Sequence, residues 1–303
     1  TIDEGWERIW NDKWKQLKEI CNYAKEKNIG VFVWKHSGSI SDPSDNYATM
    51  AHFFDSIAIS GAKGIKIDFM DSESKKMIDF DIRALQMCAE RKLMVNFHGC
   101  QKPSGEMRTY PNEITREGIR GLELNKMGQP ISPNHNVALI FTRGILNNND
   151  YTPIGFSNPG NTTWAHQLAT AYAFTSSLIT MAEHPSELLT NKNLSEILPF
   201  IKDLPTTWDE TCILPGSSID GTAILARRKR EIWYLIVLNG TKSKQISVST
   251  DFLPSGEWSM STIEDTKDNP KAVVHNTLNT NNKSTLTIDL SSGGGFVSKF
   301  VKI

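Results

Sequence analysis

Polar side chains capable of chemistry recur at the ends of the apolar, β-rich runs in this 303-residue sequence. In chain order they are Asp3 and Glu4, Trp34 and His36, Lys66, Asp68 and Asp71, His98, and Glu123 with Lys126. In a parallel barrel the carboxyl ends of the strands surround one shared mouth, where polar residues are candidates for function. Two carboxylates across such a mouth, one acting as nucleophile or base and the other as acid, are the catalytic groups that glycoside hydrolysis requires.

Asp68 is the strongest of these candidates. In the run GIKIDFMD (64–71), strand periodicity places Ile65, Ile67 and Phe69 on one face, suited to packing under helices. Lys66 and Asp68 then point together into the barrel. A charged pair in an interior costs desolvation energy and seldom persists for packing alone. Asp68 lies inside the strand, where it cannot cap a helix, and Lys66 is expected to hold it ionised.

Other polar candidates have structural alternatives that remain open. Asp71 precedes a helical segment and fits a helix N-cap better than a catalytic role. For Glu123, a salt bridge with Arg120 is as good an interpretation as catalysis. His36 and His98 also fit core histidines whose hydrogen bonds are satisfied inside the protein.

Three aromatic residues are candidates for substrate binding. Trp34, Tyr151 and Trp208 are either core aromatics or stacking platforms for the apolar faces of pyranosides.

Repeated β/α units are expected to position the candidates of the first two-thirds of the chain. Strands are predicted at 30–36, 64–71 and 93–99, with a weaker one at 119–126, and helices at 10–28 and 77–92. The period of about thirty residues is that of one β/α unit. We therefore predict an α/β fold with a (β/α)8 barrel in a catalytic domain spanning 1–208.

The last third has a different pattern. From 209 to 303, short alternating runs separated by Gly, Asn and Ser predict an antiparallel β-sandwich domain. The Asn-rich run at 268–284 is interpreted as a surface connection. A closed barrel takes about 250 residues, and roughly 205 precede the sandwich, so the barrel is expected to be N-terminally incomplete in this chain.

Composition excludes several classes of function. With 33 basic and 34 acidic residues, the formal charge of −1 gives no reason to expect a nucleic-acid partner. The four cysteines lack metal-ligand spacing, and neither GxGxxG nor a P-loop is present. No apolar run reaches the length of a membrane span.

The motifs are recognisable when taken together. GIKIDFMD, the long run from LMVNFHG at 93 to GLE at 123, DYTP (150–153), AEHP (182–185) and PTTWDET (205–211) resemble glycoside hydrolase family 97 in order and spacing. The resemblance covers nearly the whole chain. It implies a glycosidase acting on α-glycosides.

Two positions place the chain within that family. In inverting members of that family, the pair His-Glu stands where this chain has His98 and Gly99, and a glycine stands where this chain has Asp68. The resemblance therefore implies the retaining, α-galactosidase branch, with Asp68 as nucleophile and Glu123 as general acid/base. The alternatives are an α-glucosidase of the same family and a non-catalytic carbohydrate-binding fragment.

The resemblance also implies partners. Family members depend on Ca²⁺ near glutamates that correspond to Glu117 and Glu123, carry an N-terminal β-domain, and are usually exported to a bacterial periplasm. Two glutamates are a reasonable but insufficient ligand set for calcium. Lys66, His98, Trp34, His36, Asp3, Glu4, Tyr151 and Trp208 are expected to contact the sugar.

Overall fold

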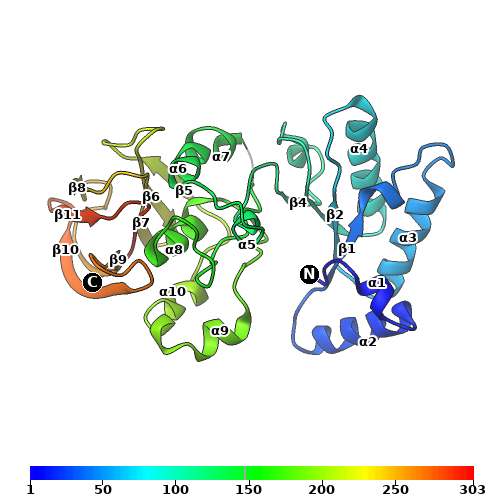
Figure 1. The fold of residues 1–303 in the computed structure, drawn as a ribbon, viewed down its shortest axis with the longest axis horizontal. Helices are drawn as coiled ribbons and strands as arrows, with labels where there is room; N and C mark the ends of the chain where they lie inside the picture. The colour runs from blue at the N-terminus through cyan, green and yellow to red at the C-terminus, as the bar shows by residue number, and fades with distance from the viewer. Residues whose placement is uncertain (147) are drawn as a thin grey trace. The chain divides into compact units, whose positions relative to one another are not determined.

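A computed structural model describes residues 1–146 and 148–303, which form two compact units (Figure 1). The first comprises Thr1–Ile119 and Leu146–Asn149, and the second comprises Arg120–Ile145 and Asp150–Ile303.

The first unit is built on a four-stranded parallel sheet with the order β1-β2-β3-β4. Its strands are β1 (Phe32–His36), β2 (Gly64–Asp68), β3 (Met94–Phe97) and β4 (Glu113–Arg116). The helical segments are α1 (Trp6–Ile9), α2 (Lys13–Glu26), η1 (Ser37–Ser39), α3 (Ala48–Ile59), α4 (Lys75–Glu90) and η2 (Glu106–Arg108). Ile2 extends the pairing beside β1 through a parallel bridge to Val33.

Alternation along the strands separates the core of this unit from its polar side. Ile65 and Ile67 of β2 are fully buried and share one apolar core with Phe80 and Leu85 of α4. Figure 1 shows α2, α3 and α4 along one side of the sheet. The face turned away from these helices is therefore left for Lys66 and Asp68.

The α/β alternation is as predicted for three strands, but the fourth differs. The strand expected at 119–126 is wrong: β4 lies at Glu113–Arg116, and Glu123–Lys126 forms the short helix α5. The sequence did not indicate β4 because the strand contains two charged residues, Glu113 and Arg116. Both are buried in the structure and pair with each other, with Arg116 Nε 2.6 Å from Glu113 Oε1. Four parallel strands support an α/β fold, and a complete (β/α)8 barrel is not confirmed.

The second unit contains a β-sandwich. Its six-stranded antiparallel sheet has the order β10-β9-β12-β7-β6-β5, and a two-stranded sheet pairs β11 with β8. The strands are β5 (Glu210–Ile213), β6 (Thr222–Lys229), β7 (Ile232–Asn239), β8 (Lys244–Ser249), β9 (Glu257–Asp265), β10 (Val273–Asn281), β11 (Thr285–Leu290) and β12 (Gly295–Lys302). Trp233 and Leu235 of the larger sheet share a buried core with Val248 and Ile288 of the smaller one.

One prediction within the sandwich is wrong. The run 268–284, expected to be a surface connection, contains the nine-residue strand β10, which pairs with β9 along its whole length. Strand β10 is at the edge of the sheet, and most of its side chains are exposed. Polar residues are tolerated there, so the apolar alternation that marks a half-buried strand is missing.

Further helices lie between β4 and the sandwich in the chain. They are α5 (Glu123–Lys126), α6 (Pro133–Phe141), α7 (Arg143–Leu146), α8 (Trp164–Ala173), α9 (Pro185–Thr190), η3 (Lys192–Leu194) and α10 (Leu198–Lys202). Helix α8 lies so close to β12 that a Cβ at Gly295 would come within 2.5 Å of the His166 Cα. The division into domains at 1–208 and 209–303 stays a prediction.

No helix in the described ranges 1–146 and 148–303 has both the length and the apolar character needed to cross a lipid bilayer.

A first prediction concerns the close packing of β2 beside β3. A Cβ at Gly64 would lie within 2.5 Å of the buried Phe32 ring and 2.6 Å from the backbone oxygen of Met94, so Gly64→Ala must displace both a packed ring and a strand. We expect the free energy of unfolding to fall by about 1–3 kcal/mol, measured by denaturant titration. Gly30→Ala is the matched control, because its Cβ would meet the flexible Lys63 side chain at 3.2 Å. Equal effects of the two substitutions would contradict this account of the packing.

Candidate active site

Asp68 is the last residue of β2 and lies beside His36 in the parallel register, while Lys66 lies beside Trp34. Alternation from the buried Ile65 and Ile67 turns Lys66 and Asp68 to the opposite face. Both charged residues are buried, with exposed fractions of 5% and 8%. The predicted placement of this pair at the carboxyl end of the strand therefore agrees with the structure.

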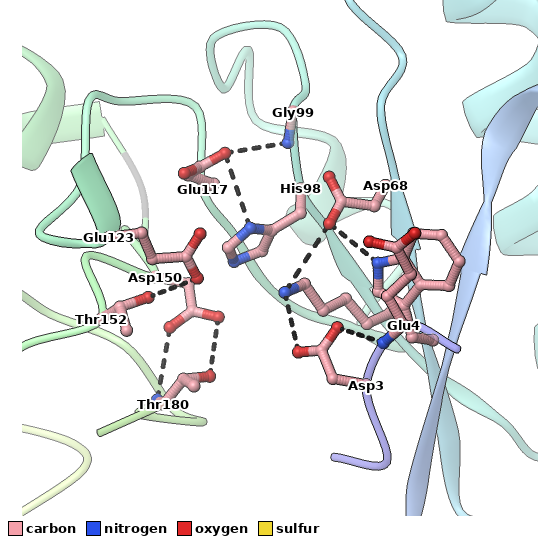
Figure 2. A network of polar contacts seen from close by, with 12 residues as sticks. Asp3, Glu4, Asp68, His98, Gly99, Glu117, Glu123, Asp150, Thr152 and Thr180 are labelled. Carbon is pink, nitrogen blue, oxygen red and sulfur yellow. Dashed lines mark hydrogen bonds and ion pairs between the residues drawn. The ribbon is translucent and has the colours of Figure 1, made fainter. Parts of the chain in front are cut away.

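Three donors contact the Asp68 carboxylate, which is labelled in Figure 2. The Trp34 indole Nε1 donates to Oδ2 at 3.0 Å, and the backbone N–H of Phe69 donates to Oδ1 at 2.8 Å. The ammonium group of Lys66 lies 3.7 Å from Oδ2 and 3.4 Å from Oδ2 of Asp3. Such contacts orient a carboxylate whose charge would be costly to bury alone.

Asp3 and Glu4 precede α1 and are exposed, in contrast to Lys66 and Asp68. Asp3 connects to the buried pair through Lys66, and its other oxygen accepts from the Glu4 backbone N–H at 2.8 Å. Asp3 therefore belongs to the polar network of Asp68, whereas Glu4 contributes its backbone N–H, which donates to Asp3.

The chain turns sharply after Asp68 and after His98. Phe69, Asp71 and Gly99 have φ values of 62°, 48° and 50°, in the left-handed region that bulky residues seldom adopt. The turn is held by Ser37 Oγ donating to the Phe69 carbonyl oxygen at 2.8 Å and by the Asp71 N–H donating to the Gly99 carbonyl oxygen at 2.9 Å. Left-handed backbone of this kind concentrates at functional sites.

This turn corrects two sequence-based expectations. Phe69 does not continue the apolar face of β2, because the strand ends at Asp68 and the reversed backbone leaves its ring 45% exposed. Asp71 is not the N-cap of α4, since Ser74 occupies that position.

An exposed pair of rings lies next to the carboxylate. Phe69 stacks on His36, with ring centroids 5.2 Å apart and an interplanar angle of 22°. The Nδ1 of His36 accepts from the Gly38 N–H at 3.0 Å, so a neutral imidazole carries its proton on Nε2. This pair therefore presents an apolar face and an N–H donor, the combination that sugar rings require.

His98 and Glu117 form the second polar group of the first unit. His98 is 2% exposed, and its Nδ1 lies 3.6 Å from Glu117 Oε2, which accepts from the Gly99 N–H at 2.8 Å. An imidazole and a carboxylate in this arrangement can take part in binding a metal ion.

The Cα of Gly99 packs closely against the Phe69 backbone and the Asp68 carboxylate. A Cβ at position 99 would lie 2.9 Å from the Phe69 backbone nitrogen and 3.1 Å from Asp68 Oδ1. A side chain at position 99 would therefore require the Phe69 backbone to move and the Asp68 carboxylate to shift with it.

Glu123 belongs to the second unit, where it is the first residue of α5 and half-buried. Its Oε1 accepts from Thr152 Oγ1 at 3.4 Å, in the loop that contains Asp150 and Tyr151 (Figure 2). The Asp150 carboxylate accepts from the backbone N–H of Thr180 at 3.3 Å and from its hydroxyl at 3.1 Å. Thr152 is in the left-handed region, at φ 57°, which is unusual for a β-branched residue.

Two aromatic candidates are packed within the second unit. Tyr151 is 1% exposed and donates its hydroxyl proton to Asn136 Oδ1 at 2.7 Å. Trp208 packs against Tyr234, with centroids 5.3 Å apart, and beneath the Arg227 guanidinium at 5.2 Å. Neither environment presents the ring as a platform, and their roles in substrate binding stay predictions.

A buried charge network lies beneath the loop that follows Gly99. Arg116, fully buried, pairs with Glu113 and lies 5.2 Å from the Phe97 ring centroid, while Gln101 donates to Asp81. Burial raises the pKa of Asp81 to about 7, and the nearby Arg116 opposes that shift. Because Glu117 directly follows Arg116, this network fixes the base of the site.

Several contributing residues were not predicted from the sequence. Phe69, Gly99 as a donor, Thr152 and Asp150 all contact the polar groups described above. The DYTP motif contained a signal for Asp150 and Thr152. The left-handed conformation of Phe69 had none, because it depends on the neighbouring turn.

Two family models match the chain. Residues 1–119 match the model described as Glycoside hydrolase 97, and residues 207–301 match Glycosyl-hydrolase 97 C-terminal, oligomerisation.

Curated relatives match almost the whole chain. It is 30% identical to a retaining alpha-galactosidase of Bacteroides thetaiotaomicron, over 98% of this chain and 47% of the relative. It is 28% identical to a probable retaining alpha-galactosidase of Streptomyces bingchenggensis, over 98% of this chain and 46% of the relative. The chain thus spans about half the length of the curated relatives it matches.

Solved structures show the same fold. A glycoside hydrolase family 97 enzyme from Pseudoalteromonas sp. strain K8 in complex with acarbose has a TM-score of 0.85 and 25% identity, covering 95% of this chain and 49% of that one. A beta-arabinopyranosidase, at 23% identity, has a TM-score of 0.82 and covers 98% of this chain and 49% of its own.

The space at Gly99 leads to a prediction about geometry and stability. We expect Gly99→Ala to displace the Asp68 carboxylate and the Phe69 backbone, visible in a crystal structure of the variant, and to destabilise the protein by about 1–3 kcal/mol. Gly105→Ala is the control, because Gly105 also has a positive φ of 100° but no atom lies within 4 Å of the point that its Cβ would occupy. An unmoved Asp68 in the Gly99→Ala structure would contradict this expectation.

Asp81 predicts a pH-dependent stability difference. Its pKa is raised from 3.8 to about 7, so the folded protein binds this proton more tightly than the unfolded chain does. That stabilisation is fully present below about pH 4 and is lost as the pH rises through about 7. We expect Asp81→Asn to be more stable than the wild type at pH 8, by up to a few kcal/mol, and the advantage to shrink toward pH 4. Denaturant titrations across this range measure the difference, and a pH-independent difference would refute it.

Proposed function

The chain belongs to glycoside hydrolase family 97, and we propose that it carries the catalytic groups of a retaining α-galactosidase. The observation that carries this proposal is the buried Asp68 carboxylate at the carboxyl end of β2, beside a glycine at position 99. A retaining enzyme needs a carboxylate placed to attack the sugar directly. An inverting enzyme needs a base with room for a water molecule, and Gly99 has no side chain to act as that base.

The first step is attack by Asp68 on the anomeric carbon of a terminal α-galactoside. Glu123 donates its proton to the glycosidic oxygen, so the aglycone leaves as an alcohol and a covalent β-galactosyl enzyme forms. In the second step Glu123, now ionised, takes a proton from water while the water oxygen attacks the same carbon. Asp68 is released as a carboxylate, and the product keeps the α configuration.

The residues around Asp68 support its role as nucleophile. Trp34 and the Phe69 N–H hold the two carboxylate oxygens in fixed directions, and Lys66 supplies a compensating charge. The exposed ring pair of Phe69 and His36 offers a stacking face and an N–H donor to a sugar. His98 and Asp3 remain proposed substrate contacts.

The proposed preference for galactosides rests on the similarity to two relatives named retaining and probable retaining alpha-galactosidase, at 30% and 28% identity. A retaining α-glucosidase would use the same two carboxylates. A substrate comparison therefore belongs in the test.

Calcium binding also stays a proposal. Within the first unit, His98 and Glu117 provide one imidazole and one carboxylate. Calcium prefers about six to eight oxygen ligands, so this pair alone does not form a calcium site. The proposed pairing of Glu117 with Glu123 rests on family resemblance, and no step above depends on a metal ion.

Three further parts of the proposal concern the whole protein. The match of 207–301 to an oligomerisation model supports self-association through the sandwich. An N-terminal β-domain as partner and export to a bacterial periplasm rest on family resemblance alone.

The decisive test replaces the nucleophile. We expect Asp68→Gly to lower hydrolysis of nitrophenyl α-galactoside by at least about 1,000-fold, because the covalent route is lost. Added azide should restore turnover and yield the inverted β-galactosyl azide, identified by proton NMR. Glu73→Ala is the matched control, since Glu73 is an exposed carboxylate five residues away and outside the proposed chemistry.

Two measurements on the wild type complete this test. Proton NMR should show the α-anomer of galactose as the first product, and nitrophenyl α-glucoside should be the poorer substrate. A β-anomer first product, or an unaffected Asp68→Gly variant, would refute the retaining mechanism. A preference for the glucoside would leave the mechanism intact and overturn the sugar specificity.

A further inference from the structure

A second set of catalytic residue types lies in the second unit, away from the residues assigned above. Ser261 of β9 and His275 of β10 are hydrogen-bonded, with Oγ and Nε2 2.8 Å apart. The other ring nitrogen of His275, Nδ1, lies 2.6 Å from Oε2 of Glu196. The three side chains form a continuous serine, histidine and carboxylate chain.

The hydrogen bonds define the proton positions in this chain. An ionised glutamate only accepts, so Nδ1 of His275 carries a proton toward Glu196. In the neutral imidazole Nε2 is then the acceptor, and the Ser261 hydroxyl donates to it. This is the tautomer that lets a histidine remove a proton from a serine.

The strand pairing shows how the fold brings these residues together. Ser261 lies opposite Lys299 of β12 and opposite Thr277 of β10, which places His275 diagonally across from Ser261 on the same face. The Phe200 ring of α10 meets the exposed His275 ring edge-on at 89°, with centroids 6.2 Å apart. Glu196 comes from the turn just before α10.

The serine opens onto a cavity of about 220 Å³. Its walls include the apolar side chains of Pro199, Phe200 and Val301, and the polar side chains of Ser259 and Lys299. The Lys299 ammonium gives one hydrogen bond to Asp203 at 2.6 Å and has two further protons. The space suits a short acyl group, and Lys299 offers positive charge for a developing oxyanion.

We propose that Ser261, His275 and Glu196 form a second catalytic site, which hydrolyses esters of short-chain carboxylic acids. The Ser261 Oγ attacks the ester carbonyl carbon, and its proton passes to His275 Nε2. The tetrahedral intermediate collapses, the alcohol leaves with that proton, and an acyl-serine remains. Water then attacks the acyl-serine through the same histidine and releases the acid.

This site is independent of the proposed glycosidase chemistry. Its test uses the whole chain and a fluorophosphonate probe, whose P–F bond breaks as a P–O bond to an activated serine forms. We expect one adduct per chain, located at Ser261 by peptide mass spectrometry, and slow hydrolysis of p-nitrophenyl acetate. Absence of any adduct, or an adduct at another residue, overturns the proposal without depending on a variant.

Variants separate catalysis from a structural role of the same hydrogen bonds. Ser261→Ala should abolish the adduct, His275→Ala should slow labelling by at least about 100-fold, and Glu196→Gln by about 10-fold or more. Ser247→Ala is the matched control, because Ser247 is an exposed strand serine of the same sandwich and does not line the cavity. Thermal unfolding confirms that each variant is folded. Ester hydrolysis that persists unchanged in folded Ser261→Ala would refute the site.

Discussion

The close approach of the Gly99 backbone to the Asp68 carboxylate is the constraint on which the candidate active site depends. Strands β2 and β3 end side by side, and the chain then reverses at Phe69 and at Gly99, both with positive φ. Two turns packed this tightly leave no volume for a Cβ at position 99. A side chain at position 99 would therefore press on the Phe69 backbone and on the Asp68 carboxylate together, so the glycine is part of what places this carboxylate.

Much of this site was predictable, because it follows from strand periodicity. Alternation in IKID separates Ile65 and Ile67 from Lys66 and Asp68, and the structure agrees, because the isoleucines join the apolar core while the lysine and the aspartate pair with each other. Strands β6, β7 and β12 were equally visible as alternating apolar runs. The prediction failed for two strands that do not alternate buried apolar residues with exposed polar ones. Strand β4 contains the buried Arg116 and Glu113, and β10 exposes most of its residues at a sheet edge. In both cases tertiary context, not local pattern, determines the strand.

The roles of the aromatic side chains at the site could not be predicted for the same reason, because they too depend on tertiary context. Trp34 was expected to be either a core aromatic or a sugar platform, and in the structure its N–H donates a hydrogen bond to the Asp68 carboxylate. The exposed ring beside the carboxylate is instead Phe69, which periodicity placed in the core. A left-handed residue inverts the direction of its side chain relative to the preceding strand, and nothing in the sequence of Phe69 itself announces that conformation.

The two compact units separate the orientation of the proposed nucleophile from that of the proposed acid/base. The donors on the Asp68 carboxylate, from Trp34, Lys66 and Phe69, all belong to the first unit, so its fold alone orients this group. The hydrogen bond on Glu123 comes from Thr152, within the second unit. Each carboxylate is thus preorganised by its own surroundings.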